Sequence, residues 1–263
     1  MEKLIVLGTG HALTTRCYNT CFALERGGEY FLVDAGGGNG ILAQMERAGV
    51  DCLSIRHLFV THCHTDHILG VIWVVRVVAA AMCKGGTAGE LHLYGHDAAM
   101  DAVQAMCRMT LQKKWVDLFG TRILFHKVED GEKASIMGCE TVFFDIASTK
   151  MKQFGFSMEL PDGKKLTCLG DEPCSPRCEG YARGSDYLLT EAFCLDGESG
   201  RYHPHEINHS TVKDAAQLSE KLGARTLLLW HTEEAHLSER RELYTEEAAR
   251  YFTGNILVPD DLD

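Results

Sequence analysis

The feature that most constrains this chain is a cluster of metal-binding residue types. Three histidines and an aspartate fall close together at His62, His64, Asp66 and His67, directly after the largely apolar run 55–60. If that run ends a strand, the alternate residues His62 and His64 project to one side. Imidazoles and a carboxylate that crowd together lose favourable hydration, and this loss is offset only if a cation binds between them. The cluster therefore predicts a metal site, and its donors suit zinc, with manganese or iron as alternatives.

Further motifs lie in an order that matches a known superfamily. With the histidine cluster, they make the chain resemble the metallo-β-lactamase superfamily, and Glu191–Ala192 and His209–Ser210–Thr211 point to its ribonuclease Z-like branch. The resemblance runs nearly end to end and implies an α/β fold, the four-layer αββα sandwich of that superfamily, which we expect as one domain over residues 1–263. The motifs lie at residues 7–10, 19–21, 33–36, 169–171, 190–193, 208–211 and 227–231.

The resemblance also implies a set of metal ligands. One metal position takes His62, His64 and a bridging aspartate, which Asp171 matches. The second takes Asp66, His67, the same bridging aspartate and a late histidine, which His231 matches. We therefore expect one or two zinc ions at the mouth where the strands before Asp171 and His231 end.

One ligand of the family pattern is missing. The position of its third histidine falls on Thr149, and no histidine occurs between His126 and His203. The first metal position then binds its ion weakly with extra water, recruits another ligand, or stays empty. The candidate replacements are His11, His203 and His205.

The catalytic roles that the resemblance implies fall on Asp66, Glu191 and His209. Asp66 would orient the attacking water, while Glu191 and His209 match motifs tied to proton transfer to the leaving oxygen and to contact with the scissile phosphate. A histidine with a carboxylate partner suits a general acid. The alternative is that residues 208–211 merely cap the following helix, and Thr190 stands where the branch usually has histidine.

The substrate class is narrowed by what the chain lacks. The interval from Thr149 to Asp171 leaves room for little more than a hairpin around 161–163, so the long tRNA-binding arm of ribonuclease Z is absent from its usual place. A net charge of −11 gives no general attraction to a polyanion, although four lysines lie near the hairpin. We expect a phosphodiesterase or ribonuclease Z-like nuclease acting on a small phosphodiester, a nucleotide or short RNA. The lysines are Lys150, Lys152, Lys164 and Lys165.

Two other functions stay open at this point. Loss of the histidine at Thr149 would also fit a catalytically degenerate member that binds metal or a nucleotide. The other possibility is a hydrolase of the same fold that acts on a carboxylic ester, lactone or thioester. The leaving groups that the enzyme prefers would distinguish such a hydrolase from a phosphodiesterase.

Composition bears on location and partners. Eleven scattered cysteines fit reduced thiols and a cytoplasmic protein, and Cys174 with Cys178 is the only close pair in a plausible loop. The apolar stretch 68–82 contains Arg76 and is short for a membrane span, so we expect a buried helix and no membrane partner. A homodimer is expected from the resemblance alone.

Hydrophobic periodicity predicts the remaining elements. We expect helices near residues 39–49, 68–83, 97–118, 212–222 and 239–252. Strands are expected at 91–94, 122–126, 140–144, 155–160, 165–169 and 226–230.

Overall fold

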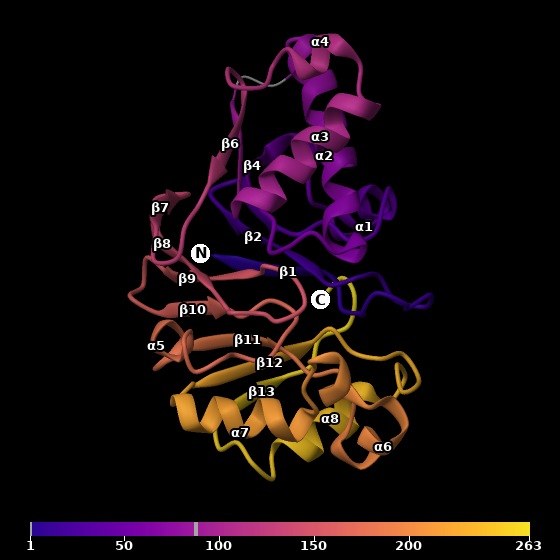
Figure 1. Cartoon of the computed structure of the whole chain (residues 1–263), viewed down its shortest axis with the longest axis vertical. Coiled ribbons are helices and arrows are strands. Elements are labelled where there is room, and N and C mark those ends of the chain that lie inside the picture. Colours follow the sequence, from indigo (N-terminus) through magenta and orange to yellow (C-terminus); the bar gives the residue numbers. More distant parts are fainter. Residues whose placement is uncertain (1, 87–88) are drawn as a thin grey trace. The chain divides into compact units, whose positions relative to one another are not determined.

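A computed structural model describes residues 2–86 and 89–263, which form two compact units (Figure 1). The first unit runs to Gly8, resumes over Tyr18–Val128 and ends with Asp261–Asp263; the second holds Thr9–Cys17 and Glu129–Asp260. Each unit has its own mixed sheet and its own helices. The predicted α/β class is confirmed, while the single domain over 1–263 stays a prediction.

The first unit is built on a six-stranded sheet in the order β1-β2-β3-β4-β5-β6. Strands β1 to β3 pair antiparallel and β3 to β6 pair parallel. The strands are β1 Lys3–Gly8, β2 Cys21–Arg26, β3 Glu29–Val33, β4 Ile55–Phe59, β5 Leu91–Gly95 and β6 Ile123–Lys127; the helices are α1 Gly40–Ala48, the 3-10 turn η1 Cys52–Ser54, α2 Thr65–Cys83, α3 Asp97–Thr110 and α4 Lys113–Val116.

Helix α2 is the central helix of this unit. Its length and apolar composition would fit a membrane span, but more than half of its apolar window is buried in the unit. Gly70 brings it close to the turn after β3, because a Cβ there would lie 1.8 Å from the Ala35 carbonyl oxygen. Gly70 also donates its N–H to the Gly36 carbonyl at 2.9 Å. The predicted buried helix is confirmed, and its first turn is fixed against the turn after β3.

The second unit is built on a seven-stranded sheet in the order β13-β12-β11-β10-β9-β8-β7. Strands β10 to β13 are parallel and β7 to β10 antiparallel. The strands are β7 Lys133–Ile136, β8 Cys139–Asp145, β9 Phe154–Glu159, β10 Lys165–Cys168, β11 Tyr187–Glu191, β12 Thr226–Trp230 and β13 Asn255–Leu257; the helical segments are α5 Glu179–Ala182, η2 Asp196–Glu198, α6 Ser199–Tyr202, η3 Pro204–Ile207, α7 Val212–Leu222 and α8 Arg240–Ala248.

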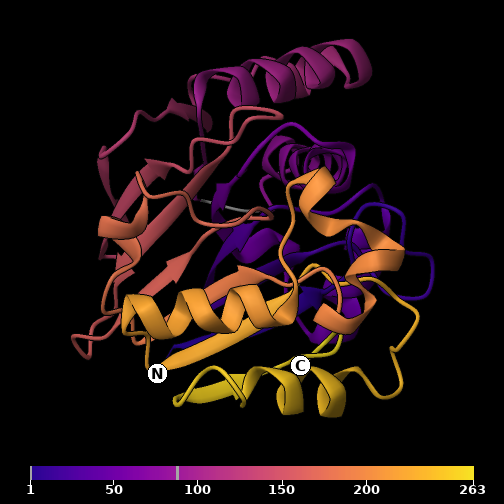
Figure 2. The ribbon, with the colours of Figure 1, turned by 60° about the horizontal axis from the view of Figure 1, so that its bottom comes forward.

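Helices α7 and α8 pack on this second sheet (Figure 2). Val212, Ala215 and Ala216 of α7 share a buried cluster with Leu227 and Leu229 of β12. Helix α7 has the predicted bounds because both ends carry strong signals: Thr211 forms a capping box at the start, and Gly223 adopts a left-handed conformation at the end.

The predicted helix over 97–118 is wrong as a single element. The chain is extended at Leu111 and Gln112, so α3 ends at Thr110 and α4 begins at Lys113. The break lets Trp115 pack in the core, where it is 8% exposed. The helix near 239–252 is shorter than predicted, and the strands β7, β11 and β13 had not been predicted.

The turn between β9 and β10 agrees with its sequence. The two strands pair antiparallel, and Gly163 takes the positive φ of 78° that this tight turn requires.

The cysteines are free thiols throughout. The Sγ atoms of Cys174 and Cys178 lie 2.7 Å apart in the buried loop after β10. No third histidine, cysteine or carboxylate joins them in a metal-sized group among the described residues.

Candidate metal and catalytic site

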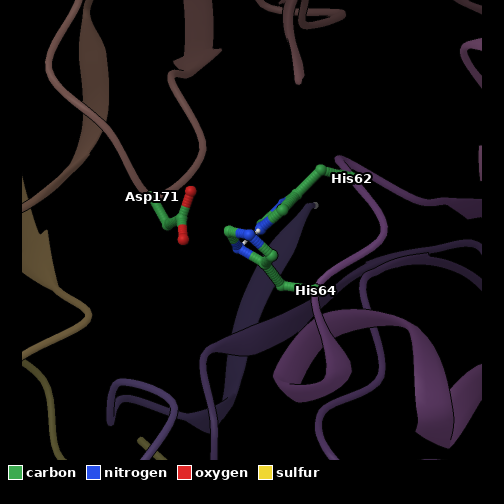
Figure 3. A group of neighbouring side chains, drawn as sticks. All are labelled: His62, His64 and Asp171. Atoms are coloured by element: carbon green, nitrogen blue, oxygen red, sulfur yellow. Dashed lines mark hydrogen bonds between the residues drawn. The ribbon is translucent and has the colours of Figure 1, made fainter. Parts of the chain in front are cut away.

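The four ligand candidates of the first unit lie at the carboxyl end of β4 and the start of α2. His62 and His64 come from the segment after β4, with His62 Nε2 2.8 Å from His64 Nδ1 (Figure 3). Asp66 and His67 occupy the first turn of α2, where His67 Nε2 lies 3.2 Å from Asp66 Oδ2. The ring centroids of His62 and His67 are 4.2 Å apart. The structure thus brings these four side chains together as predicted.

Asp34, directly after the neighbouring parallel strand β3, orients this cluster. Its carboxylate accepts the Nδ1–H of His67 at 2.7 Å and the N–H and hydroxyl of Thr61 at 2.9 and 2.7 Å. The Thr61 hydroxyl oxygen in turn lies 2.9 Å from His62 Nδ1. Because a carboxylate can only accept, the Nδ1 of His67 carries the proton, and Nε2 is the ring nitrogen that could coordinate a metal.

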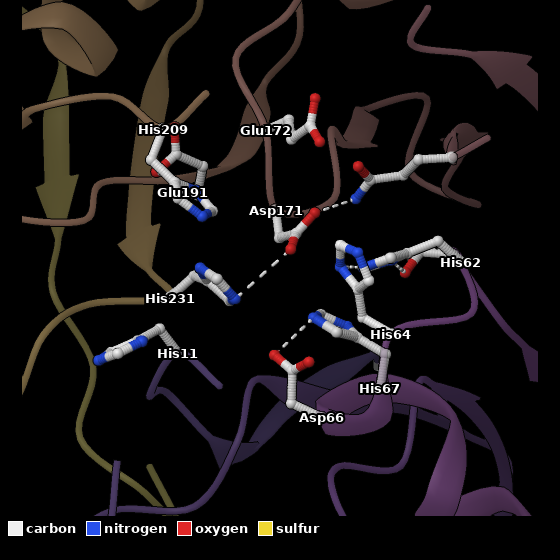
Figure 4. Close-up of polar contacts among 12 residues, drawn as sticks. His11, His62, His64, Asp66, His67, Asp171, Glu172, Glu191, His209 and His231 are labelled. Atoms are coloured by element: carbon white, nitrogen blue, oxygen red, sulfur yellow. Dashed lines mark hydrogen bonds and ion pairs between the residues drawn. The ribbon is translucent and has the colours of Figure 1, made fainter. Parts of the chain in front are cut away.

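The candidates of the second unit follow three adjacent parallel strands. Asp171 comes after β10, Glu191 ends β11 and His231 comes after β12. The carboxyl ends of parallel neighbours meet at one edge of a sheet, which is where α/β proteins place their ligands. His231 Nε2 lies 3.6 Å from Asp171 Oδ2, and both side chains are buried (Figure 4).

Glu191 and His209 form the carboxylate–imidazole pair that the motifs predicted. Glu191 is fully buried; its Oε1 accepts the Ser210 N–H at 2.6 Å, and its Oε2 lies 3.6 Å from His209 Nδ1. The His209 ring stacks on Phe193 with centroids 5.2 Å apart. Burial lowers the pKa of His209, but the Glu191 carboxylate outweighs that effect, so the pKa lies above its ordinary value.

The helix cap proposed as an alternative to a functional His209 is present as well. Thr211, not His209, caps α7 with Asp214. His209 Nδ1 instead faces Glu191, so the cap does not account for this histidine.

Thr149, at the position of the missing histidine, lies in an exposed bend. Two of the candidate replacements are exposed and engaged elsewhere: His203 with Glu206 at 3.4 Å and His205 with Asp214 at 2.7 Å. His11 lies beside His231 with ring centroids 6.5 Å apart. Of the three candidate replacements, His11 is thus the one with a ring contact to a predicted ligand, His231, within the second unit.

Sequence reasoning missed Gln153, which supports Asp171, and Glu172, which follows Asp171 in the chain. Gln153 donates its side-chain N–H to Asp171 Oδ1. Glu172 is 2% exposed and accepts hydrogen bonds from the Ser148 hydroxyl at 2.8 Å and from the Asn208 amide. The acidic pair at 171–172 was a visible signal for Glu172, whereas nothing in the sequence singled out Gln153.

The lysines near the hairpin do not act as one basic group. Lys150 pairs with Glu172 at 3.3 Å, and Lys164 pairs with Asp162 at 2.7 Å. Lys165 donates to the Arg183 carbonyl at 3.1 Å. Lys150 is therefore a lysine whose partner, Glu172, follows the predicted ligand Asp171 directly in the chain.

Comparison with known proteins places the chain in a family. The family model described as Anti-Pycsar protein Apyc1 matches residues 2–248. This chain belongs to the Apyc1 family. The family model spans both units and every predicted ligand and catalytic residue.

Curated relatives of this Apyc1-family chain are ribonucleases Z. The enzyme of Thermococcus sibiricus is 25% identical, over 100% of this chain and 95% of that protein. The enzyme of Myxococcus xanthus is 24% identical, over 95% of this chain and 92% of that protein. The predicted superfamily and its ribonuclease Z-like branch are confirmed.

Solved structures share the fold at low sequence identity. The metallo-β-lactamase fold protein YhfI of Bacillus subtilis matches with a TM-score of 0.80 at 16% identity, covering 100% of this chain and 98% of that one. The short form of human tRNase Z (TM-score 0.75) and a diphosphatase of the PhnP family (0.74) are each 18% identical; both comparisons cover 100% of this chain, with 98% and 96% of the respective neighbours. The Apyc1-family chain therefore has the metallo-β-lactamase fold.

Proposed function

We propose that this chain is a metal-dependent phosphodiesterase acting on a small phosphodiester, a nucleotide or short RNA. The hydrolase class follows from its ribonuclease Z relatives, and the finer substrate class rests on the residues of this chain. The carboxylate–imidazole pair of Glu191 and His209 carries the proposal, because it supplies the proton donor that phosphodiester cleavage needs at the leaving oxygen.

The metal ligands are proposed from the residues present. His62, His64, Asp66 and His67 of the first unit, with Asp171 and His231 of the second, would hold one or two ions. Nitrogen and oxygen donors in this ratio suit zinc, with manganese or iron as the alternatives. Asp34 supports the assignment, because a carboxylate behind a metal-binding histidine is the usual means of fixing its tautomer. Bound metal would lower the pKa of a water molecule and stabilise charge on a phosphoryl oxygen.

The protein side chains have separate roles in the proposed reaction. Asp66 would orient the attacking water and accept its proton. His209 would donate its proton to the leaving oxygen, and Glu191 would orient the imidazole through its Nδ1 atom. Lys150, next to the buried Glu172, would contact a substrate phosphate oxygen.

The first test is hydrolysis of bis(p-nitrophenyl) phosphate by protein purified without chelator and supplied with zinc or manganese. We expect metal-dependent turnover that is lost in Asp66→Ala while the circular dichroism spectrum is retained. Full activity of Asp66→Ala would refute the assignment. Metal binding without turnover on any phosphodiester would favour the degenerate alternative, and turnover of carboxylic esters alone would favour the esterase alternative.

A further inference from the structure

We propose that Glu198, Glu233 and His236 form an additional divalent-cation site within the second unit. Glu198 ends η2, whereas Glu233 and His236 belong to the segment between β12 and α8. One potential ligand atom from each residue lies within 4.8 Å of the other two. None of the three belongs to the ligand set proposed above for the hydrolytic centre.

Glu233 gives the strongest argument for an ion. The residue is 3% exposed, and its Oε2 accepts the Tyr202 hydroxyl at 3.0 Å and the Ala235 N–H. Its Oε1 is buried and has no hydrogen-bond partner among the described residues. A carboxylate oxygen withdrawn from water is unfavourable unless a hydrogen bond or a cation replaces the lost hydration. A cation held between the three side chains would supply that interaction.

Glu198 and His236 already have a spacing that suits two ligands of one ion. His236 Nε2 lies 3.0 Å from Glu198 Oε1, and ligands of a tetrahedral ion with bonds of about 2.0 Å are separated by roughly 3.3 Å. The second oxygen of Glu198 is also buried without a hydrogen-bond partner in the described part of the chain. Small side-chain movements would therefore be enough to complete the site.

The surrounding charges favour a cation. Arg201 approaches Glu198 only to 3.8 Å and is largely exposed. The buried Arg240 is engaged by Asp260 at 2.9 Å instead. Burial and then the nearby carboxylates, Glu198 and Glu233 first among them, raise the pKa of Cys194 to about 12. The Glu198 and Glu233 carboxylates thus bring two acidic side chains to the same cluster.

The donor set indicates the type of ion. Two carboxylates and one imidazole suit a first-row transition ion such as Mn²⁺ or Zn²⁺ better than Ca²⁺, which prefers oxygen ligands alone. The ion would join η2 to the segment that begins directly after His231, and so would restrain the chain beside a proposed ligand of the hydrolytic centre.

The test counts bound ions on the full chain. Chelator-treated protein is dialysed against excess Mn²⁺, and bound metal per chain is measured by mass spectrometry for wild type, Glu233→Gln and Glu206→Gln. Glu206 is the matched control because it is an exposed glutamate that also pairs with a histidine. We expect one ion fewer in Glu233→Gln and no change in Glu206→Gln. Equal stoichiometry in all three proteins would overturn the proposal.

Two further measurements separate this site from the hydrolytic centre and from a folding defect. In an Asp66→Asn/His67→Asn background, adding Glu233→Gln should still remove one ion, whatever the activity of the parent. Should Glu233→Gln lose its native circular dichroism spectrum, His236→Asn, which changes a less buried side chain, is measured instead. A His236→Asn variant that folds and keeps every ion would also refute the site.

Discussion

Asp34 is the residue through which the histidine cluster is oriented. It has a positive φ of 54°, a conformation that aspartate and asparagine tolerate better than most residues. From this position its two oxygens reach both His67 and Thr61. The hydrogen bond to His67 Nδ1 therefore fixes the orientation of that imidazole ring.

We predict that Asp34→Asn binds metal about 10- to 100-fold more weakly than wild type. The amide keeps the backbone conformation, but it replaces one acceptor oxygen with a donor and removes the charge that fixes the His67 tautomer. Competition against a chromophoric chelator measures the affinity. Asp51→Asn is the control, because Asp51 is an exposed aspartate that caps the turn η1 in the same unit. Affinities equal to wild type in both variants would contradict the orienting role.

His209 calls for a test that distinguishes chemistry from packing. We predict that His209→Gln lowers kcat on a dinucleotide by about 10²- to 10⁴-fold, the usual contribution of a general acid. The loss on bis(p-nitrophenyl) phosphate should be much smaller, because nitrophenolate leaves without protonation. Equal losses on both substrates would mean that His209 only maintains the shape of the site.

At the scale of elements, strands β4, β5 and β6 carry a row of stacked aromatic rings that the sequence did not predict. His57 stacks on His92 with centroids 5.4 Å apart, and His92 stacks on His126 at 5.3 Å. The Tyr94 hydroxyl lies 3.4 Å from His57 Nδ1. Each histidine was visible in its strand, but the strand order that makes them neighbours was not.

This row makes stability depend on pH. Burial first, and then the charges of His92, His126 and Arg56, lower the pKa of His57 from 6.5 to about 4. Below pH 6.5, His57 is protonated in the unfolded chain but stays neutral in the folded chain. The free energy of unfolding therefore falls as the pH falls towards 4. From 1.36 kcal/mol per pKa unit, the contribution at pH 5 is about 2 kcal/mol.

Denaturant unfolding at pH 7.5 and pH 5 measures how much the titration of His57 contributes to the free energy of unfolding. His57→Gln should lose about 2 kcal/mol less than wild type between the two pH values, since glutamine does not titrate. Because His57 is coupled to His92 and His126, the difference between the proteins measures the titration of His57 together with that coupling. Identical losses would show that His57 titrates normally in the folded chain.

The elements that the sequence predicted are those with strong local signals. Helix α7 has a capping box at one end and a glycine at the other, and the hairpin between β9 and β10 has its proline, aspartate and glycine. The break after α3 depends on Trp115 reaching the core, and β13 is a strand of only three residues. Neither feature can be seen in periodicity alone, because tertiary packing decides both.

For the whole molecule, the sequence indicates candidate ligands more readily than it indicates the residues around them. The ligand candidates carry metal-binding chemistry at strand ends, and a pattern of residue types is enough to find them. Gln153 and Glu172 act only through the folded chain: Gln153 becomes a partner of Asp171 because the antiparallel β9–β10 pair brings the start of one strand beside the end of the other. Such partners require the register of the sheet.

Net charge is the whole-molecule property that bears most directly on substrate. At −11, and with Lys150, Lys164 and Lys165 each engaged by a partner within the chain, the chain has little to neutralise a long row of phosphates. A protein that contacts one phosphate loses about threefold in affinity between 50 and 200 mM salt, whereas one that contacts six to ten loses about 10³- to 10⁵-fold.

We therefore predict that kcat/KM on a dinucleotide falls by about threefold or less between 50 and 200 mM salt. Precursor tRNA should be cleaved poorly at both salt concentrations, because the net charge of −11 gives no general attraction to it and residues 149–171 leave no room for a long arm. Initial rates at substrate concentrations far below KM give kcat/KM directly, and the wild-type protein serves for both substrates. Efficient cleavage of precursor tRNA with a steep salt dependence would instead show that a polyanion-binding surface exists, and would replace the small-phosphodiester assignment with a tRNA-processing one.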